Sequence, residues 1–173
     1  MSASDNGKKK LAILVTKGSL DWAYPSFILG SSAAAMGWDV VLFFTFYGLA
    51  LLKKDLKPGI SPLGNPAMPM KMPFGPPWFQ GIEWNMPNLL MAGIPGFESM
   101  ATTFMKMTVK NHGIATIPEL RDLCIEAEVN LVACQMTVDL FDFEPADLID
   151  DIDFGGAATF FEFAGESDIN LFI

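Results

Sequence analysis

Two cysteines and one histidine are the residues of this 173-residue sequence best suited to nucleophilic or transition-metal chemistry. Cys124 and Cys134 are ten positions apart, so they do not form a C-x-x-C redox motif. With His112 as the single histidine, the chain has too few ligands for a zinc site of its own. We therefore expect no metal and no cofactor, and any thiol chemistry should depend on one cysteine.

Cys134 has the position that a reactive thiol requires. It ends the apolar run Asn130–Cys134, which predicts a short strand, and a helix is expected to follow at once from residue 135 or 136 to about residue 140. The N–H groups and dipole at a helix start can lower a thiol pKa from about 8.5, and the thiolate is the nucleophile. The alternative is a buried cysteine that packs as a small apolar residue.

Cys124 and His112 are better explained by structure than by catalysis. Cys124 has the helical spacing of Leu120 and Ala127, which predicts that it faces the core. His112 stands where a predicted helix ends, and a polar residue at a helix end needs no catalytic explanation.

The elements that must position these residues begin with two apolar runs, Leu11–Thr16 and Asp39–Phe46, which predict buried strands. Between them we expect a helix capped by Asp21, with Pro25 in its first turn, ending at Gly37. A strand, a helix and a strand within about 35 residues form a βαβ unit, whose crossover makes the two strands parallel. The expected fold class is α/β with a mostly parallel sheet between two helix layers.

A long Pro- and Met-rich segment, residues 58–95, interrupts this pattern. It holds nine of the 12 prolines, and eight of the 11 methionines lie between residues 68 and 107. Proline removes backbone donors, so long regular elements are not expected in this segment. We expect a single domain over residues 1–173, with this segment as an insertion. Its tryptophans and methionines are too apolar for open solvent, so the insertion should be ordered and should pack on the rest of the domain or on a neighbouring subunit. It can act there as a lid over a site or as a binding surface for a flexible partner.

The rest of the chain alternates between helices and strands. From Phe97 an amphipathic helix is expected to run to residues 111–113, and the capping box Thr116–Glu119 opens the helix that carries Cys124. After an acidic linker at residues 144–153, residues 157–164 predict a helix and residues 169–173 a final strand.

The charge distribution narrows the class of partner. After Arg121 the chain has 13 acidic residues and no Lys or Arg. Nucleic acid needs a basic surface, so it is not an expected partner, and no nucleotide-binding glycine motif is present. The acidic part suits a basic protein partner, or it only keeps an apolar protein in solution.

No segment predicts membrane integration or export. The apolar stretch at residues 40–52 is too short to span a bilayer, and the run that follows Lys8, Lys9 and Lys10 is too short for a signal peptide. We expect a cytoplasmic protein, in which Cys124 and Cys134 are free thiols.

Several strings of this sequence resemble the DsrE/DsrF-like family, and more narrowly its subgroup often labelled as peroxiredoxin-family or sulfur-carrier proteins. The resemblance covers nearly the whole chain, and the strings that carry it are Glu119–Cys124 (ELRDLC), Ala133–Phe141 (ACQMTVDLF), Gly155–Phe160 (GGAATF), Ser61–Pro66 (SPLGNP) and Met72–Pro76 (MPFGP). It implies a flavodoxin-like three-layer fold and a homo-oligomer.

The resemblance also implies that Cys134 accepts sulfane sulfur as a persulfide and passes it to a thiol protein, with TusA-like and rhodanese-like proteins as partners. Peroxide reduction is not favoured, since the one arginine, Arg121, belongs to another element. A flavodoxin-like flavin- or nucleotide-binding protein and a peripheral membrane protein that uses the Pro- and Met-rich segment remain as alternatives.

Overall fold

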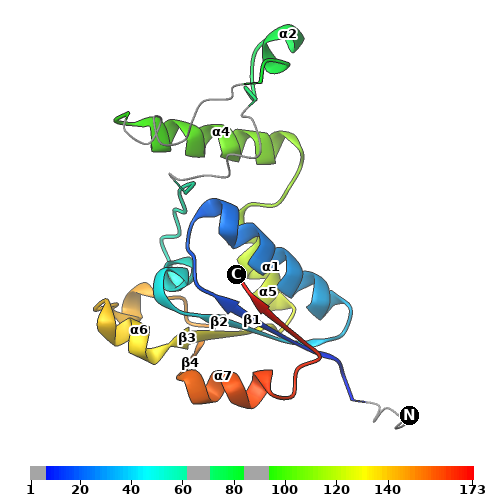
Figure 1. Cartoon of the computed structure of the whole chain (residues 1–173), viewed down its shortest axis with the longest axis vertical. Coiled ribbons are helices and arrows are strands. Elements are labelled where there is room, and N and C mark those ends of the chain that lie inside the picture. Colours follow the sequence, from blue (N-terminus) through cyan, green and yellow to red (C-terminus); the bar gives the residue numbers. More distant parts are fainter. Residues whose placement is uncertain (1–6, 62–70, 84–93) are drawn as a thin grey trace. The chain divides into compact units, whose positions relative to one another are not determined.

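The computed structural model describes residues 7–61, 71–83 and 94–173 (Figure 1). These residues form two compact units. The first comprises residues 1–18, 22–57 and 117–173, and the second comprises residues 19–21 and 58–116, as far as each is described. Among the described residues, no helix is both long and apolar enough to cross a membrane.

A five-stranded sheet forms the centre of the first unit. Its strand order is β4-β3-β2-β1-β5 and every pairing is parallel. The strands are β1 (Lys10–Val15), β2 (Asp39–Phe44), β3 (Asn130–Cys134), β4 (Asp153–Gly155) and β5 (Ile169–Phe172). The expected α/β class with a parallel sheet is therefore confirmed.

Helices lie on both faces of this sheet (Figure 1). The helical elements of the first unit are α1 (Leu20–Ala35, which starts in the second unit), η1 (Phe46–Leu52), α5 (Ile117–Glu126), α6 (Gln135–Leu140), η2 (Pro145–Asp147) and α7 (Ala157–Ala164). Helices α1 and α5 cover one face and α7 lies against the other (Figure 1). The last crossover, from β4 through α7 to β5, carries the chain to the opposite edge of the sheet.

Two consecutive residues of β2 show how the two faces of the sheet are built, because successive side chains of a strand point to opposite sides. Phe44 is fully buried and its ring centroid lies 5.9 Å from that of Phe27 in α1. Phe43 faces the other way, 5.4 Å from Phe160 of α7. Burial on both sides explains why this strand is apolar without interruption.

Two expectations about individual elements are wrong. Residues 153–155, expected between the end of an acidic linker at residue 153 and the next helix, form β4, because main-chain pairing with Val132–Cys134 needs no apolar side chains. Helix α1 starts at Leu20, so Asp21 lies inside its first turn and Pro25 lies within the helix. The carbonyl of Gly59 accepts the Leu20 N–H at 2.7 Å, which allows this earlier start.

The second unit contains α2 (Pro77–Gln80) and α4 (Phe97–Asn111). Helix α4 ends where the sequence predicts, with Gly113 in the left-handed region at φ +66°. The ring of Phe74 packs on Phe104 with centroids 5.4 Å apart, so part of the Pro- and Met-rich segment packs on α4. Residues 62–70 and 84–93 of that segment lie outside the described residues, so its expected order is not tested there.

Gly48, in the loop after β2, is expected to be indispensable for stability. A Cβ atom at this position would lie 2.3 Å from the Val15 carbonyl oxygen, and a backbone atom cannot move aside as a flexible side chain can. Gly48→Ala should therefore lower the free energy of unfolding by more than about 2 kcal/mol in urea titrations. Gly81→Ala is the control, since its Cβ would meet only ordinary contacts at 3.6 Å. Equal stabilities of the two variants would contradict the close packing of these loops.

Candidate functional site

The loops after β1, β2 and β3 meet at the carboxyl edge of the sheet, where parallel α/β folds gather their functional groups. The Gly48 N–H donates to the Thr16 carbonyl at 3.1 Å, which joins the first two loops. The hydroxyls of Thr45 and Thr137 are 3.1 Å apart, and the Phe46 N–H donates to the Thr137 hydroxyl at 3.2 Å. These hydrogen bonds join the second loop to the start of α6.

Cys134 lies at this junction, as the sequence predicts. It is the last residue of β3 and the N-cap residue of α6. Its side chain is in a buried cluster with Val41, Phe43 and Val132 on the α7 face of the sheet, and only 5% of the residue is exposed. The thiol is therefore a shielded group at the edge of the sheet.

Opposing effects act on the pKa of Cys134, and the net result is a lowered value. Burial is the largest single effect and raises the pKa, because it disfavours the thiolate. Hydrogen bonds to the sulfur from the side chain and backbone of Thr137, the hydroxyl of Thr45 and the backbone of Met136 together outweigh burial. The surroundings of Cys134 therefore favour a thiolate.

The source of this stabilisation is local. Helix α6 has only six residues, and the amides of Met136 and Thr137 at its start are the backbone groups that interact with the Cys134 sulfur. A helix of this length has a weak dipole, so nearby donors must contribute most. The Thr137 hydroxyl is the strongest such donor, with the Thr45 hydroxyl beside it, and sequence reasoning missed both. Thr137 stands three residues after Cys134, the position at which a helix start faces its N-cap residue.

Cys124 has the opposite environment. It is fully buried in α5, and its thiol donates to the Phe27 carbonyl at 3.5 Å. Burial raises the pKa of Cys124 to about 12, so the thiol stays protonated at neutral pH. Its predicted place in the core is confirmed, although Ala127, expected on the same face, follows the end of α5 and is exposed.

Arg121 has a structural role on the same helix. Its guanidinium group is buried and donates to the carbonyls of Leu51 and Lys53, at 3.2 and 2.7 Å. Burial lowers the pKa of Arg121. Arg121 therefore fixes the end of η1, the element that begins beside Thr45.

His112 and the acidic residues form no metal site in the described part of the chain. The His112 ring nitrogen Nδ1 lies 2.8 Å from the carbonyl oxygen of Thr108, which is one turn earlier in α4. Within residues 7–61, 71–83 and 94–173, no three His, Cys, Asp or Glu side chains gather as metal ligands do.

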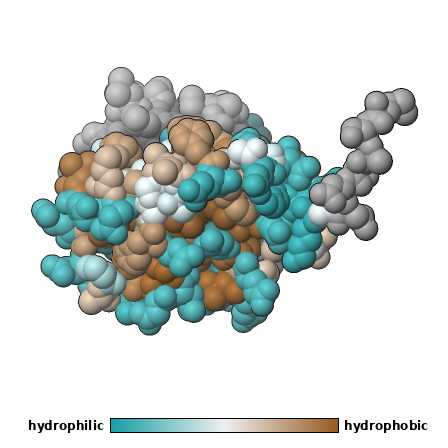
Figure 2. All heavy atoms as spheres, turned by 90° about the horizontal axis from the view of Figure 1, so that it is seen from below, coloured by the Kyte–Doolittle hydropathy of each residue, from teal (hydrophilic) through white to brown (hydrophobic). Residues whose placement is uncertain are grey.

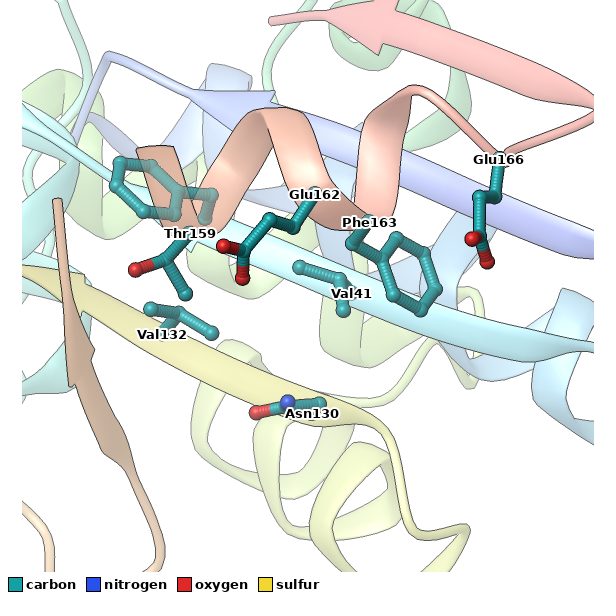
Figure 3. A pocket seen from close by; sticks show the side chains of 8 residues that line it. Val41, Asn130, Val132, Thr159, Glu162, Phe163 and Glu166 are labelled. Carbon is teal, nitrogen blue, oxygen red and sulfur yellow. The ribbon is translucent and has the colours of Figure 1, made fainter. Parts of the chain in front are cut away.

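A cavity of about 310 Å³ opens between α7 and the sheet, and the sequence analysis did not predict it (Figure 3). Its lining combines apolar side chains with two carboxylates, from Val41, Phe43, Asn130, Val132, Thr159, Glu162, Phe163 and Glu166. Cys134 does not line it, although three of these residues belong to the cluster around Cys134. Figure 2 views this side of the first unit and shows apolar surface between polar groups.

Comparisons with known proteins agree over nearly the whole length. The model of a family described as "DsrE/DsrF/DrsH-like family" matches residues 7–172. The chain is 57% identical over 166 residues to "Sulfur carrier protein DsrE2" of Allochromatium vinosum, which covers 96% of this chain and 99% of the relative. It is 31% identical over 165 residues to "Uncharacterized protein YrkE" of Bacillus subtilis, which covers 95% of this chain and 97% of that protein.

A solved structure supports the fold alone. The crystal structure of the ychN protein from E. coli aligns with a TM-score of 0.57 at 11% sequence identity, covering 96% of this chain and 100% of that one.

The two cysteines should differ sharply in alkylation. In the folded protein, Cys134 should react with iodoacetamide with an apparent pKa below that of a cysteine in the denatured chain, because its pKa is lowered. Cys124, with a pKa of about 12, should react only on unfolding. The measurement is the alkylation rate of each cysteine against pH, by peptide mass spectrometry.

Thr137 variants test the cause of this difference. Thr137→Val removes the hydroxyl donor and should raise the apparent pKa of Cys134, whereas Thr137→Ser keeps the hydroxyl and should raise it less. An unchanged pKa in Thr137→Val would show that the hydroxyl does not stabilise the thiolate.

Proposed function

The chain belongs to the DsrE/DsrF/DrsH-like family, and from this premise we propose that it is a sulfur carrier whose sulfur-binding residue is Cys134. The single observation that carries the proposal is the position of Cys134 at the junction of β3 and α6, and its lowered pKa there supports it. A thiolate can attack the outer sulfur of a sulfane donor; the donor's sulfur–sulfur bond breaks, the rest of the donor leaves as a thiolate, and the transferred sulfur stays as a persulfide, as in disulfide exchange. The relative named as a sulfur carrier supports this function.

Delivery of the sulfur requires a second thiol, which the proposal assigns to another protein. Cys124 is the only other cysteine of the chain, and it stays protonated in the core on the α1–α5 side of the sheet. TusA-like and rhodanese-like proteins are the proposed partners. We assign the exchange to the cytoplasm, where free thiols are kept reduced.

A homo-oligomer is part of the same proposal. Both faces of a parallel sheet are normally covered, and here the eight-residue α7 is the helix that lies against the face formed by Val41, Phe43 and Val132. Phe161 of α7 keeps 69% of its surface exposed. A second copy of the chain is the proposed cover for this apolar surface.

Sulfur loading should depend on Cys134 alone. After exposure to polysulfide, intact mass spectrometry should show the addition of a single sulfur atom, removable by dithiothreitol because a persulfide is open to thiol attack. Cys134→Ser should abolish the addition, and Cys124→Ser should leave most of it. Loading that survives in Cys134→Ser and disappears in Cys124→Ser would identify the other cysteine as the carrier. Loading at neither cysteine would end the carrier proposal.

Association with a basic partner should be sensitive to salt. The 13 acidic residues after Arg121, with no basic residue among them, should speed the encounter with a positively charged carrier protein. The association rate, followed by stopped-flow fluorescence, should fall as ionic strength rises from about 0.01 to 0.15 M, since the screening length shrinks from about 30 to 8 Å. A rate that does not respond to salt would mean that these charges serve solubility only.

A further inference from the structure

Three aromatic side chains form an exposed cluster that neither the fold nor the carrier chemistry accounts for. They are Phe46 and Tyr47 of η1 and Phe141 after α6, and they are called the aromatic rim below. The centroid of Phe141 lies 6.3 Å from that of Phe46 and 6.0 Å from that of Tyr47. The exposed fractions are 46% for Phe46, 71% for Tyr47 and 41% for Phe141. Contiguous exposed rings mark a surface that contacts another molecule.

The aromatic rim is tied to the thiol through Thr137. The Phe46 N–H donates to the Thr137 hydroxyl at 3.2 Å, and the Phe141 N–H donates to the Thr137 carbonyl at 3.1 Å. The same threonine side chain and its backbone amide interact with the Cys134 sulfur. A molecule that rests on the rim is therefore next to the group that carries sulfur.

The backbone beside the aromatic rim is strained. Phe46 has φ +47° and Asp142 has φ +49°, in the left-handed region that residues other than glycine rarely adopt. Such conformations cost roughly 1–3 kcal/mol each and concentrate at binding and catalytic sites. The Phe46 ring is 46% exposed beside this conformation.

The charge around the aromatic rim selects a cationic occupant. Residues 135–153 contain seven acidic residues and no Lys or Arg, and one of the seven, Asp150, is paired with Lys54 at 3.1 Å. Asp142 follows Phe141 directly in the chain, whereas Asp139 stands two residues before it and accepts from the Gln135 side-chain amide at 2.8 Å. Carboxylates beside aromatic faces attract ammonium and guanidinium groups by charge and by cation–π contact.

A ring next to the aromatic rim already makes one such contact. The Lys53 ammonium group lies 4.7 Å from the ring centroid of Phe143, and Phe143 lies 6.5 Å from Phe141. The rim offers further ring faces of this kind beside Cys134.

Charge also argues against other occupants. A second copy that presented the same rim would bring Asp142 of both copies together. An anionic membrane surface would be repelled in the same way.

Building on the proposed function, we propose that the aromatic rim with Asp139 and Asp142 is the docking surface for a partner protein whose acceptor cysteine stands in an Arg- or Lys-rich segment. In the transfer step the partner thiol loses its proton and attacks the outer sulfur of the Cys134 persulfide. A new sulfur–sulfur bond forms on the partner, the bond to Sγ breaks, and Cys134 leaves as a thiolate that takes up the proton. One sulfur atom changes carrier, with no net oxidation or reduction.

The test uses two synthetic peptides, each with one cysteine, flanked by two arginines on either side or by two glutamates on either side. Persulfide-loaded full-length protein is discharged by each peptide and by dithiothreitol, and the sulfur transferred is followed by mass spectrometry. For each protein, the rate of sulfur transfer to the peptide is divided by the rate of sulfur transfer to dithiothreitol. The readout is this ratio for a variant divided by the same ratio for the wild type. The intrinsic reactivity of each peptide cancels in this comparison.

For the arginine peptide, Tyr47→Ala should lower the readout about two- to fivefold, the size of one lost cation–π contact, and Tyr47→Trp should restore it. Asp139→Asn should lower it as well, and the wild-type preference for this peptide should shrink as salt rises. Met36→Ala is the matched control, because Met36 is exposed to 72%, against 71% for Tyr47, and lies at the opposite end of the sheet. Glu126→Gln, in α5, is the charge control.

Three results would overturn the docking surface. The first is a loss of the readout in Met36→Ala as large as that in Tyr47→Ala, and the second is a loss in Tyr47→Ala that is as large with the glutamate peptide as with the arginine peptide. The third is a Tyr47→Ala protein that dissociates in light scattering, which would make the rim an interface between copies. Failure of the carrier function is seen separately, as wild-type protein that takes up no sulfur. In that case calorimetry of the arginine peptide with the unloaded protein still tests the rim, and tighter binding than of the glutamate peptide supports it.

Discussion

The hydroxyl of Thr137 is the group on which the candidate site depends. It is fully buried, so leaving it unpaired would cost roughly 1–3 kcal/mol. It is satisfied by the Phe46 N–H and by its contact with Thr45, and both residues belong to the loop after β2. The same hydroxyl stabilises the thiolate of Cys134. One polar group thus couples the loop conformation, the strained backbone of Phe46 and the pKa of the thiol.

The parallel register of the sheet is what allows this coupling. Phe44 is paired with Ala133 and with Val15, so β1, β2 and β3 end at the same level. The loops after β1 and β2 are packed tightly against each other, because a Cβ atom at Gly18 or Gly48 would lie 2.3 Å from a backbone carbonyl oxygen. Arg121 holds the other end of η1 from within the core. The backbone of η1 is therefore held at both ends by side-chain hydrogen bonds, from Thr137 at its start and from Arg121 at its end.

Much of this arrangement follows from the sequence, because its main elements obey simple patterns. Continuous apolar runs predicted β1, β2 and β3, and helical spacing predicted the buried position of Cys124. Features that depend on long-range contacts could not be predicted. Residues 153–155 became β4 through main-chain pairing with β3, which leaves little trace in side-chain pattern.

The site itself shows the same limit. The position of Cys134 at the end of a strand is a local property, and it was predicted. The threonines that lower its pKa are 92 residues apart, and only the folded sheet brings their hydroxyls within 3.1 Å. The positive φ of Phe46 could not be predicted either, because a bulky residue normally has a negative φ.

The sheet separates the two cysteines chemically as well as spatially. Cys124 bonds to the Phe27 carbonyl on the α1–α5 side, whereas Cys134 packs with Val41 and Phe43 on the α7 side. A disulfide needs Cα atoms within about 7 Å and facing side chains, which the intervening backbone of the sheet prevents. A persulfide on Cys134 would therefore have no resolving thiol within its own folded chain. Its sulfur would stay in place until an external thiol arrives, and this retention distinguishes a carrier from an enzyme that resolves its own intermediate.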